Sequence, residues 1–544
     1  MSPRAVDYLV RAVSDLGVRH IFGVDGANIE DLYDAIFASP HITGVVAKHE
    51  FAAAAMADGY ARSTAGLGVV AATSGGGAMN LVAGLAESFI SRVPVLALVG
   101  QPPTALEGRG AFQDTSGMAG TFDAARIFEQ ISHYCARVCD AALLPEHLER
   151  AVRAARRGGP AVLLLPKDVQ QAPLAAAPLR PAPRESRFDA AGFARIRAEL
   201  RAARSRGKIT IIAGDQVARD DARIELRRLA AALDAAVGVA PDAKDVYHQD
   251  EPGFCGVAGT MGHPELVDAI RGAALCLLIG TRLPLTARAG LDEALDGTTL
   301  ASVGAEPPYA PSVHATTTDL AATLGALADE LGDGEPPIAV SRPAPTPLSV
   351  PLSSGPGLRY RDIVETLGAA MEPGTDVFAD AGNTGAAVVH HLRVPREGRF
   401  TVALGMGGMG YAFGAGIGSS FARARRTFVI AGDGAFFMHG MEVHTAIEYG
   451  LPVTFVVFNN NAHAMCLTRE QLYYGNRYSF NRFHPARPGE GVAAMFPELP
   501  AYSPTGTAEL ADAVRHCIRG TGPSFISIDC DPDEIPPFTP FLSA

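Results

Sequence analysis

The sequence predicts an α/β protein with three domains, each built on a parallel β-sheet flanked by helices. The chain has 544 residues, which is too long for one hydrophobic core and corresponds to about three domains at roughly 150 residues each. Unbroken apolar runs alternate with helix-like segments along the whole chain, as expected for sheets that are buried on both faces. Two stretches rich in proline and alanine, 171–185 and 332–357, separate three such blocks.

These stretches define the expected domains. We place an N-terminal domain at 1–172, a central α/β domain at 188–335 and a C-terminal domain at 356–544. Hydrophobic residues make up 48% of the chain and charged residues 19%, a composition typical of a well-buried globular protein.

In the N-terminal block, residues 45–50 predict a strand that delivers Glu50 to the start of an alanine-rich helix at 51–62. A second strand at 68–72 leads into the glycine-rich segment 73–80 and a further helix. A carboxylate at a helix start is favourable beside the helix dipole, and this alone could explain Glu50.

The central block has the same alternation. Apolar runs at 208–214 and 275–280 predict buried strands, and helices are expected near 222–233 and 264–270. We therefore expect a parallel sheet here as well.

The C-terminal block carries the most informative pattern. The apolar strand 427–431 ends in Gly432-Asp433-Gly434, a helix is expected over 436–449, and the strand 453–458 then delivers Asn459-Asn460. One carboxylate and one amide oxygen, together with diphosphate oxygens, form the hard oxygen site that Mg²⁺ prefers. Free N–H groups at the helix start would meet a phosphate.

A competing interpretation lies just upstream. Residues 405–410 fit G-x-G-x-x-G and open a helix at 411–421, with Asp433 at the end of the next strand, where a dinucleotide fold places its ribose-binding acid. This interpretation leaves Asn459-Asn460 and the N-terminal third unexplained.

The run from Gly432 to Asn460 resembles the thiamin diphosphate motif, which begins Gly-Asp-Gly and ends in paired asparagines, and 45–80 resemble the pyrimidine-binding domain of thiamin enzymes. The chain is similar to the family of acetohydroxyacid synthases, pyruvate oxidases and benzoylformate decarboxylase, and most similar to the synthases. Further matching segments, in the synthase order, are 22–26, 110–114, 160–169 and 408–411.

The resemblance implies that thiamin diphosphate and Mg²⁺ bind. The metal ligands would be Asp433, the Asn460 side chain and the backbone carbonyl of Ala462. Glu50 would hydrogen-bond the aminopyrimidine ring, and Met409 would prop the cofactor in its bent form, although a methionine here could also be core filler. The other cofactor-binding positions carried over are Gly408, Gly432, Gly434, Ala435, His463 and Met465.

The implied activity is decarboxylation of a 2-oxo acid and ligation of the product to a carbonyl acceptor, as a transferase or lyase. Catalytic candidates are Glu50, Gln113 and His463, and substrate candidates are Gly26, Phe112, Gln113, Lys167 and Arg469.

Several residues near the site depart from the synthase pattern. Gly76 replaces a proline, Met79 a threonine, and His463-Ala464-Met465 a Gln-Gly-Met. Arg469 stands where many synthases have a tryptophan, and this chain has none. Arg469 could meet an anionic substrate group or simply face solvent, and His463 could donate a proton or only hydrogen-bond locally.

Three alternatives stay open. A non-ligating decarboxylase would protonate the same intermediate and release an aldehyde. An FAD-containing oxidase is disfavoured because the segment 280–285 lacks the Phe-Asp-Asp-Arg continuation of flavin-bearing synthases. A nucleotide-binding oxidoreductase or a silent binding protein would leave Glu50 without a role.

The family binds each cofactor between the N-terminal domain of one chain and the C-terminal domain of another, so we expect a homodimer or homotetramer with its active sites at the subunit interface. The formal charge of −12 and the lack of a dense basic block argue against nucleic acid. No signal-peptide core or long apolar run suggests a membrane partner, so we expect a cytoplasmic protein. The seven cysteines, including Cys135 and Cys139 at helical i, i+4 spacing, are expected to be reduced core thiols.

Overall fold

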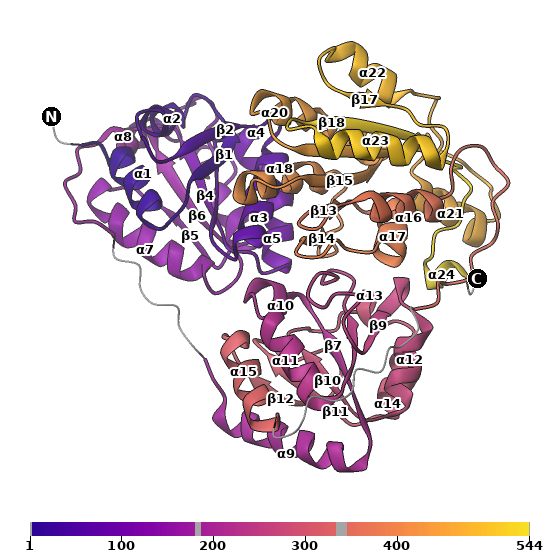
Figure 1. Cartoon of the computed structure of the whole chain (residues 1–544). Coiled ribbons are helices and arrows are strands. Elements are labelled where there is room, and N and C mark those ends of the chain that lie inside the picture. Colours follow the sequence, from indigo (N-terminus) through magenta and orange to yellow (C-terminus); the bar gives the residue numbers. More distant parts are fainter. Residues whose placement is uncertain (1–2, 180–186, 333–344, 543–544) are drawn as a thin grey trace.

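The computed structural model describes residues 3–179, 187–332 and 345–542 (Figure 1). It contains three six-stranded sheets in which the paired strands run parallel, with helices packed against them. The predicted α/β class with three parallel sheets is therefore confirmed. Parts of both proline-rich stretches, 180–186 and 333–344, lie outside the described residues, as does the end of the expected central domain.

The first sheet has the strand order β2-β1-β3-β4-β6-β5. Its strands are β1 (His20–Val24), β2 (Thr43–Val46), β3 (Gly68–Ala72), β4 (Val95–Gln101), β5 (Tyr134–Arg137) and β6 (Pro160–Pro166). Its helices are α1 (Ala5–Asp15), α2 (Glu30–Phe37), α3 (Glu50–Thr64), α4 (Gly76–Asn80), α5 (Val82–Ile90), α6 (Ala124–Glu129), α7 (Leu144–Ala155) and α8 (Lys167–Gln171), with 3-10 turns η1 (Thr104–Leu106) and η2 (Ala141–Leu143). The strands β3, β4 and β6 are buried along their whole length, which explains their unbroken apolar sequences.

The second sheet has the order β12-β11-β10-β7-β8-β9. Its strands are β7 (Lys208–Ala213), β8 (Ala236–Val239), β9 (Phe254–Val257), β10 (Ala273–Ile279), β11 (Leu300–Gly304) and β12 (Val313–Thr316). Its helices are α9 (Ala190–Arg206), α10 (Asp215–Arg219), α11 (Arg223–Leu233), α12 (Pro264–Arg271), α13 (Leu285–Arg288), α14 (Asp292–Asp296) and α15 (Leu320–Leu331), with the turn η3 (Gly259–Met261).

The third sheet has the order β14-β13-β15-β16-β18-β17. Its strands are β13 (Asp376–Ala379), β14 (Phe400–Val402), β15 (Thr427–Gly432), β16 (Val453–Asn459), β17 (Ala501–Tyr502) and β18 (Ser524–Asp529). Its helices are α16 (Tyr360–Ala370), α17 (Gly382–His391), α18 (Tyr411–Arg423), α19 (Asp433–His439), α20 (Val443–Glu448), α21 (Ala464–Tyr474), α22 (Pro488–Met495), α23 (Thr507–Arg519) and α24 (Thr539–Leu542), with the turn η4 (Gly440–Glu442).

Two local expectations were wrong. The single helix expected over 436–449 is broken into α19, η4 and α20, and the break falls at Gly440, which packs so closely on the Phe436 ring that a Cβ there would lie 2.2 Å from it. Cys135 lies in β5 rather than on a helix, and Cys139 and Cys466 are exposed instead of buried in a core.

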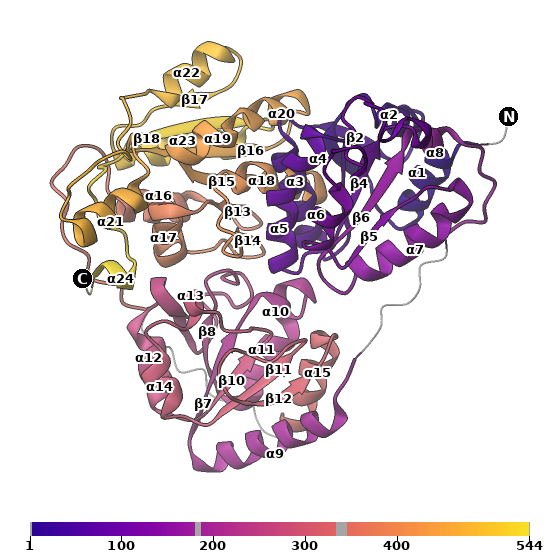
Figure 2. The same ribbon diagram turned by 180° about the vertical axis from the view of Figure 1, so that it is seen from behind.

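The helices α3 and α18 join the N-terminal and C-terminal sheets (Figure 2). Their backbones touch because glycines line the crossing: a Cβ on Gly418 would lie 1.9 Å from the Met56 carbonyl oxygen, and one on Gly59 would lie 2.1 Å from that of Ala415. A hydrogen bond of 2.7 Å between Ser63 and Ser419 adds to this contact. The packing fixes the helix of Glu50 relative to the loop that precedes α18.

Among the described residues, none of the helices has both the length and the apolar character that a membrane crossing requires.

Candidate active site

Asp433 lies at the carboxyl end of β15 and begins α19. Its side chain is 1% exposed, and its carboxylate accepts hydrogen bonds from the backbone N–H groups of Gly434, at 2.8 Å, and Asn461. Burial raises the pKa of Asp433 to about 6, against the opposing effect of these N–H groups. A buried carboxylate of this kind is stabilised in its charged form by a nearby cation.

Asn460 follows β16, the strand paired with β15, so it reaches the same edge of the sheet. Its Oδ1 accepts from the Ala462 N–H at 3.0 Å, and its Nδ2 donates to the Tyr360 hydroxyl at 3.0 Å. The chain turns back at Asn461, which has a left-handed φ of 52°. The Ala462 N–H also contributes to the hydrogen bonding of Asp433, so the carboxylate and the amide oxygen converge on one turn.

This turn fits a hard divalent cation. The available donors are the carboxylate of Asp433, the amide oxygen of Asn460 and the carbonyl of Ala462, all of them oxygen atoms of the type that suits Mg²⁺. The sequence-predicted ligands are thus brought together by β15, β16 and the turn after β16.

Met409 and His463 meet above Gly434. A Cβ on Gly434 would lie 2.7 Å from His463 Cδ2 and 3.1 Å from Met409 Cε, so only glycine lets both side chains approach the backbone this closely. His463 precedes α21, its backbone N–H donates to the Asn481 carbonyl at 2.9 Å, and its ring packs edge-on against Phe483.

The remaining cofactor positions expected from the sequence are close in the chain to the residues just described. Gly432 ends β15, Ala435 is buried in α19, Met465 is half-buried in α21, and Gly408 lies against the Phe51 ring.

Asp380, which sequence reasoning missed, holds the loop that carries Met409. Its carboxylate accepts from the N–H groups of Gly410 and Ala412, each at 3.0 Å. Burial raises the pKa of Asp380 to about 6. The signal in the sequence was an acidic residue directly after the apolar strand β13, at the same sheet edge as Asp433.

In the N-terminal domain, Glu50 begins α3 and is 8% exposed. Asn80 donates to Glu50 Oε2 at 2.9 Å, and Gly77 lies beside Oε1, where a Cβ would come within 2.9 Å. Asn80 appeared in the sequence only as part of a glycine-rich segment, because its contact with Glu50 depends on the tertiary fold.

Gln113 and Gly26 lie at the same edge as Glu50, around Thr73. The Thr73 hydroxyl donates to Gln113 Oε1 at 3.1 Å, and Cβ atoms on Gly26 and Gly77 would lie 2.8 Å and 3.0 Å from Thr73 Cγ2. Phe112 is 73% exposed. Two substrate candidates, Gln113 and Gly26, therefore share one rim with Glu50.

The two remaining substrate candidates, Lys167 and Arg469, have no contact of this kind with Thr73 or Glu50 among the described hydrogen bonds. Lys167 donates to Glu30 at 2.7 Å and to the Ala27 carbonyl at 2.8 Å, which gives it a local structural role. Arg469 is exposed on α21, in keeping with the solvent-facing alternative.

Within one chain, the start of α3 contacts the C-terminal domain. Phe51 Cζ lies 3.3 Å from the Cβ position of Gly408, and Glu442 accepts from the backbone N–H groups of Lys48 and His49 at 2.9 and 3.1 Å. The hydrogen-bond partners of Glu50 and of Asp433 described above belong to their own domains.

Comparisons with known proteins agree with this geometry. Three family models match the chain: the N-terminal TPP binding domain of thiamine pyrophosphate enzymes over 3–119, the central domain over 195–331, and the C-terminal TPP binding domain over 380–528. Relatives include a probable acetolactate synthase large subunit of Methanocaldococcus jannaschii, 27% identical over 99% of this chain and 93% of the relative. An acetolactate synthase large subunit of Mycobacterium tuberculosis is 28% identical over 87% of this chain and 78% of its own, and that of Pyropia yezoensis is 28% identical over 95% and 90%.

Proposed function

Because the chain belongs to the thiamine pyrophosphate enzymes, we propose that it decarboxylates a 2-oxo acid and ligates the remaining fragment to a carbonyl acceptor, in the manner of an acetolactate synthase. The observation that carries this proposal is the presence of two half-sites, the Asp433–Asn460 turn in one domain and the Glu50–Asn80 pair in another. The dinucleotide alternative uses Asp433 but leaves Asn460 and the Glu50–Asn80 pair without a role.

The turn after β16 is the proposed Mg²⁺ site. Asp433, Asn460 and the Ala462 carbonyl would hold the cation. When bound, thiamin diphosphate supplies a nucleophilic carbon and an electron sink.

The residues of the chain have distinct parts in this proposal. Glu50 would exchange a proton with the aminopyrimidine through Oε1, since Asn80 already occupies Oε2. Met409 would hold the cofactor in its bent form, and its loop is fixed by the hydrogen bond from the Gly410 N–H to Asp380. Gln113, held by Thr73 on the rim of Glu50, would orient the substrate.

A plain decarboxylase is the second candidate, and the position of His463 favours it. Its ring lies at Gly434 beside Met409, and an imidazole at this point could deliver a proton to the reacting carbon. Protonation there would release an aldehyde in place of a ligated product.

The proposed assembly is a homodimer or larger oligomer in which each Glu50 acts with the Asp433 of another chain. Large apolar side chains are exposed beside both half-sites of the single chain, as expected for surfaces that a second copy covers. They are Phe112, Met118 and Phe122 near the Glu50 half-site, and Met406, Phe437 and Met438 near the Asp433 half-site.

Incubation of the protein with thiamin diphosphate, Mg²⁺ and a panel of 2-oxo acids tests the function, with carbon dioxide and organic products followed by mass spectrometry. With pyruvate, acetolactate or acetoin supports ligation, and acetaldehyde as the sole product supports the decarboxylase. Absence of carbon dioxide release from every 2-oxo acid would refute both.

A further inference from the structure

Tyr360 is the first residue of α16 and is 1% exposed. Its ring stacks against Phe458 of β16 with centroids 6.1 Å apart and an interplanar angle of 17°. Its hydroxyl accepts the hydrogen bond from Asn460 Nδ2 at 3.0 Å.

The direction of this hydrogen bond follows from the contact that the other polar atom of the Asn460 amide makes with Ala462. The backbone N–H of Ala462 can only donate, so the Asn460 atom that faces it, at 3.0 Å, has to be the oxygen. The NH₂ group therefore faces Tyr360. If the amide turned over, two donors would meet at Ala462, and Oδ1 would be withdrawn from the turn that holds the Asp433 carboxylate.

We propose that Tyr360 is a positioning residue for the cation site, whose hydroxyl keeps Asn460 Oδ1 directed toward Asp433. This proposal rests on the proposed function, because it takes Asn460 and Asp433 as Mg²⁺ ligands. Residues that hydrogen-bond a metal ligand orient it for the ion. Their loss weakens metal binding even though the ligand itself is still present.

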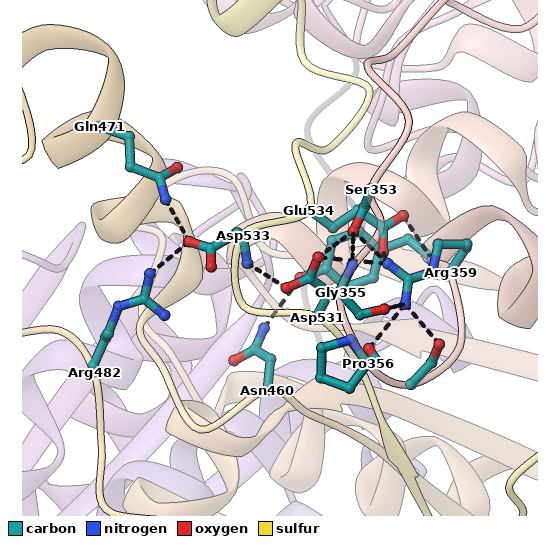
Figure 3. A network of polar contacts seen from close by, with 12 residues as sticks. Ser353, Gly355, Pro356, Arg359, Asn460, Gln471, Arg482, Asp531, Asp533 and Glu534 are labelled. Carbon is teal, nitrogen blue, oxygen red and sulfur yellow. Dashed lines mark hydrogen bonds and ion pairs between the residues drawn. The ribbon is translucent and has the colours of Figure 1, made fainter.

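The start of α16 is itself anchored. The Tyr360 backbone N–H donates to Glu534 Oε1 at 2.9 Å. The preceding Arg359 donates to the carbonyls of Gly355 and Pro356 at 2.8 Å and pairs with Asp531 at 3.5 Å. Figure 3 shows Arg359, Asp531 and Glu534 gathered around Ser353, to the upper right of Asn460. These contacts connect the C-terminal segment 531–534 to the tyrosine and limit its movement.

The hydroxyl has a second amide neighbour. Asn383, in the first turn of α17 and 3% exposed, acts on the same hydroxyl by lowering its pKa, while its own Nδ2 donates to Thr468 Oγ1 at 3.4 Å.

Tyr360→Phe keeps the ring and removes only the acceptor for Asn460. We expect that the Mg²⁺ concentration needed for half-maximal thiamin diphosphate binding, measured by titration calorimetry, rises about tenfold, while turnover at saturating Mg²⁺ stays close to wild type. Tyr247→Phe is the matched control, since it likewise removes one hydroxyl from a buried tyrosine, in this case a hydroxyl that donates to the Pro252 carbonyl in the central domain. An unchanged Mg²⁺ requirement in Tyr360→Phe would overturn the proposal.

A second pair of variants separates positioning from general stability. In an Asn460→Ser background the amide is absent, so adding Tyr360→Phe should change the Mg²⁺ requirement by less than about twofold. A full additional effect in that background would show that Tyr360 does not act through Asn460. If wild-type protein bound thiamin diphosphate equally well without divalent cations, the proposed function itself would fail, independently of any result with Tyr360.

Discussion

Asn80 donates a hydrogen bond of 2.9 Å to Oε2 of Glu50, and this leaves the two oxygens of the carboxylate in different surroundings. Oε1 faces Gly77, and a Cβ added to this glycine would lie only 2.9 Å from Oε1. The pair thus directs one oxygen of a buried acid toward the space where a ligand has to bind.

Gly77→Ala tests this arrangement. Its Cβ would lie 2.9 Å from Glu50 Oε1, and because the carboxylate is the movable partner, we expect it to shift and turnover to fall about ten- to a hundredfold. Gly76→Ala, the neighbouring position on α4, is the control because nothing lies within 4 Å of its Cβ position. Equal activity of the two variants under steady-state assay would contradict the role given to Oε1.

Asp433→Ala should abolish cation-dependent binding of thiamin diphosphate. The variant removes the charged oxygen donor that Asp433, at the end of β15, contributes to the proposed site, and the loss of a direct cation ligand at a buried site costs several kcal/mol. Calorimetry on the variant and on wild type, each with and without Mg²⁺, measures the effect. Unchanged affinity in the variant would remove Asp433 from the ligand set.

Subunit complementation tests the site between chains. Co-expressed Glu50→Gln and Asp433→Ala chains would form mixed dimers in which one of two sites carries neither change, so about a quarter of wild-type activity should return. If each site were formed by a single chain, every site would carry a defect, and the mixture would be as inactive as the separate variants.

Stability should fall in mild acid because of a histidine cluster between α12 and α17. His390 donates through Nδ1 to the Met261 carbonyl and accepts at Nε2 from the Leu348 N–H, each at 3.0 Å, so it has to be neutral. Burial lowers the pKa of His390 to about 4 and that of the adjacent His391 to about 3, from 6.5, with the nearby Lys244 acting in the same direction.

The unfolded chain therefore binds protons below about pH 6.5 that the folded chain does not. The contribution of these histidines to the free energy of unfolding is greatest above this pH and declines from there toward pH 4. Thermal unfolding midpoints across this range measure the decline. His391→Phe, which keeps a ring against His390, should make the decline shallower than in wild type, and an identical pH dependence of the two proteins would disprove this account.

Much of the C-terminal half-site could be predicted from the sequence because it depends on local patterns. The apolar strands β15 and β16 are buried on both faces, and two adjacent parallel strands deliver Asp433 and Asn460 to one edge. The same reasoning placed Glu50 at the start of α3.

The supporting residues could not be predicted, since their partners are distant in sequence. Tyr360 and Asn460 are 100 positions apart, and Glu50 and Asn80 are 30 apart. Nothing in the segment around Lys167 indicated its ion pair with Glu30, and the break at Gly440 depends on where the Phe436 ring packs.

Carbon dioxide release by the Glu50→Gln variant, loaded with thiamin diphosphate and Mg²⁺ and given a 2-oxo acid that wild type consumes, tests the central claim most directly. Glutamine keeps the shape and the Asn80 contact but cannot hold the proton, so we expect unchanged cofactor affinity and a rate lower by about a hundredfold or more. Turnover at the wild-type rate would contradict the assignment of Glu50 and, with it, the proposed active site.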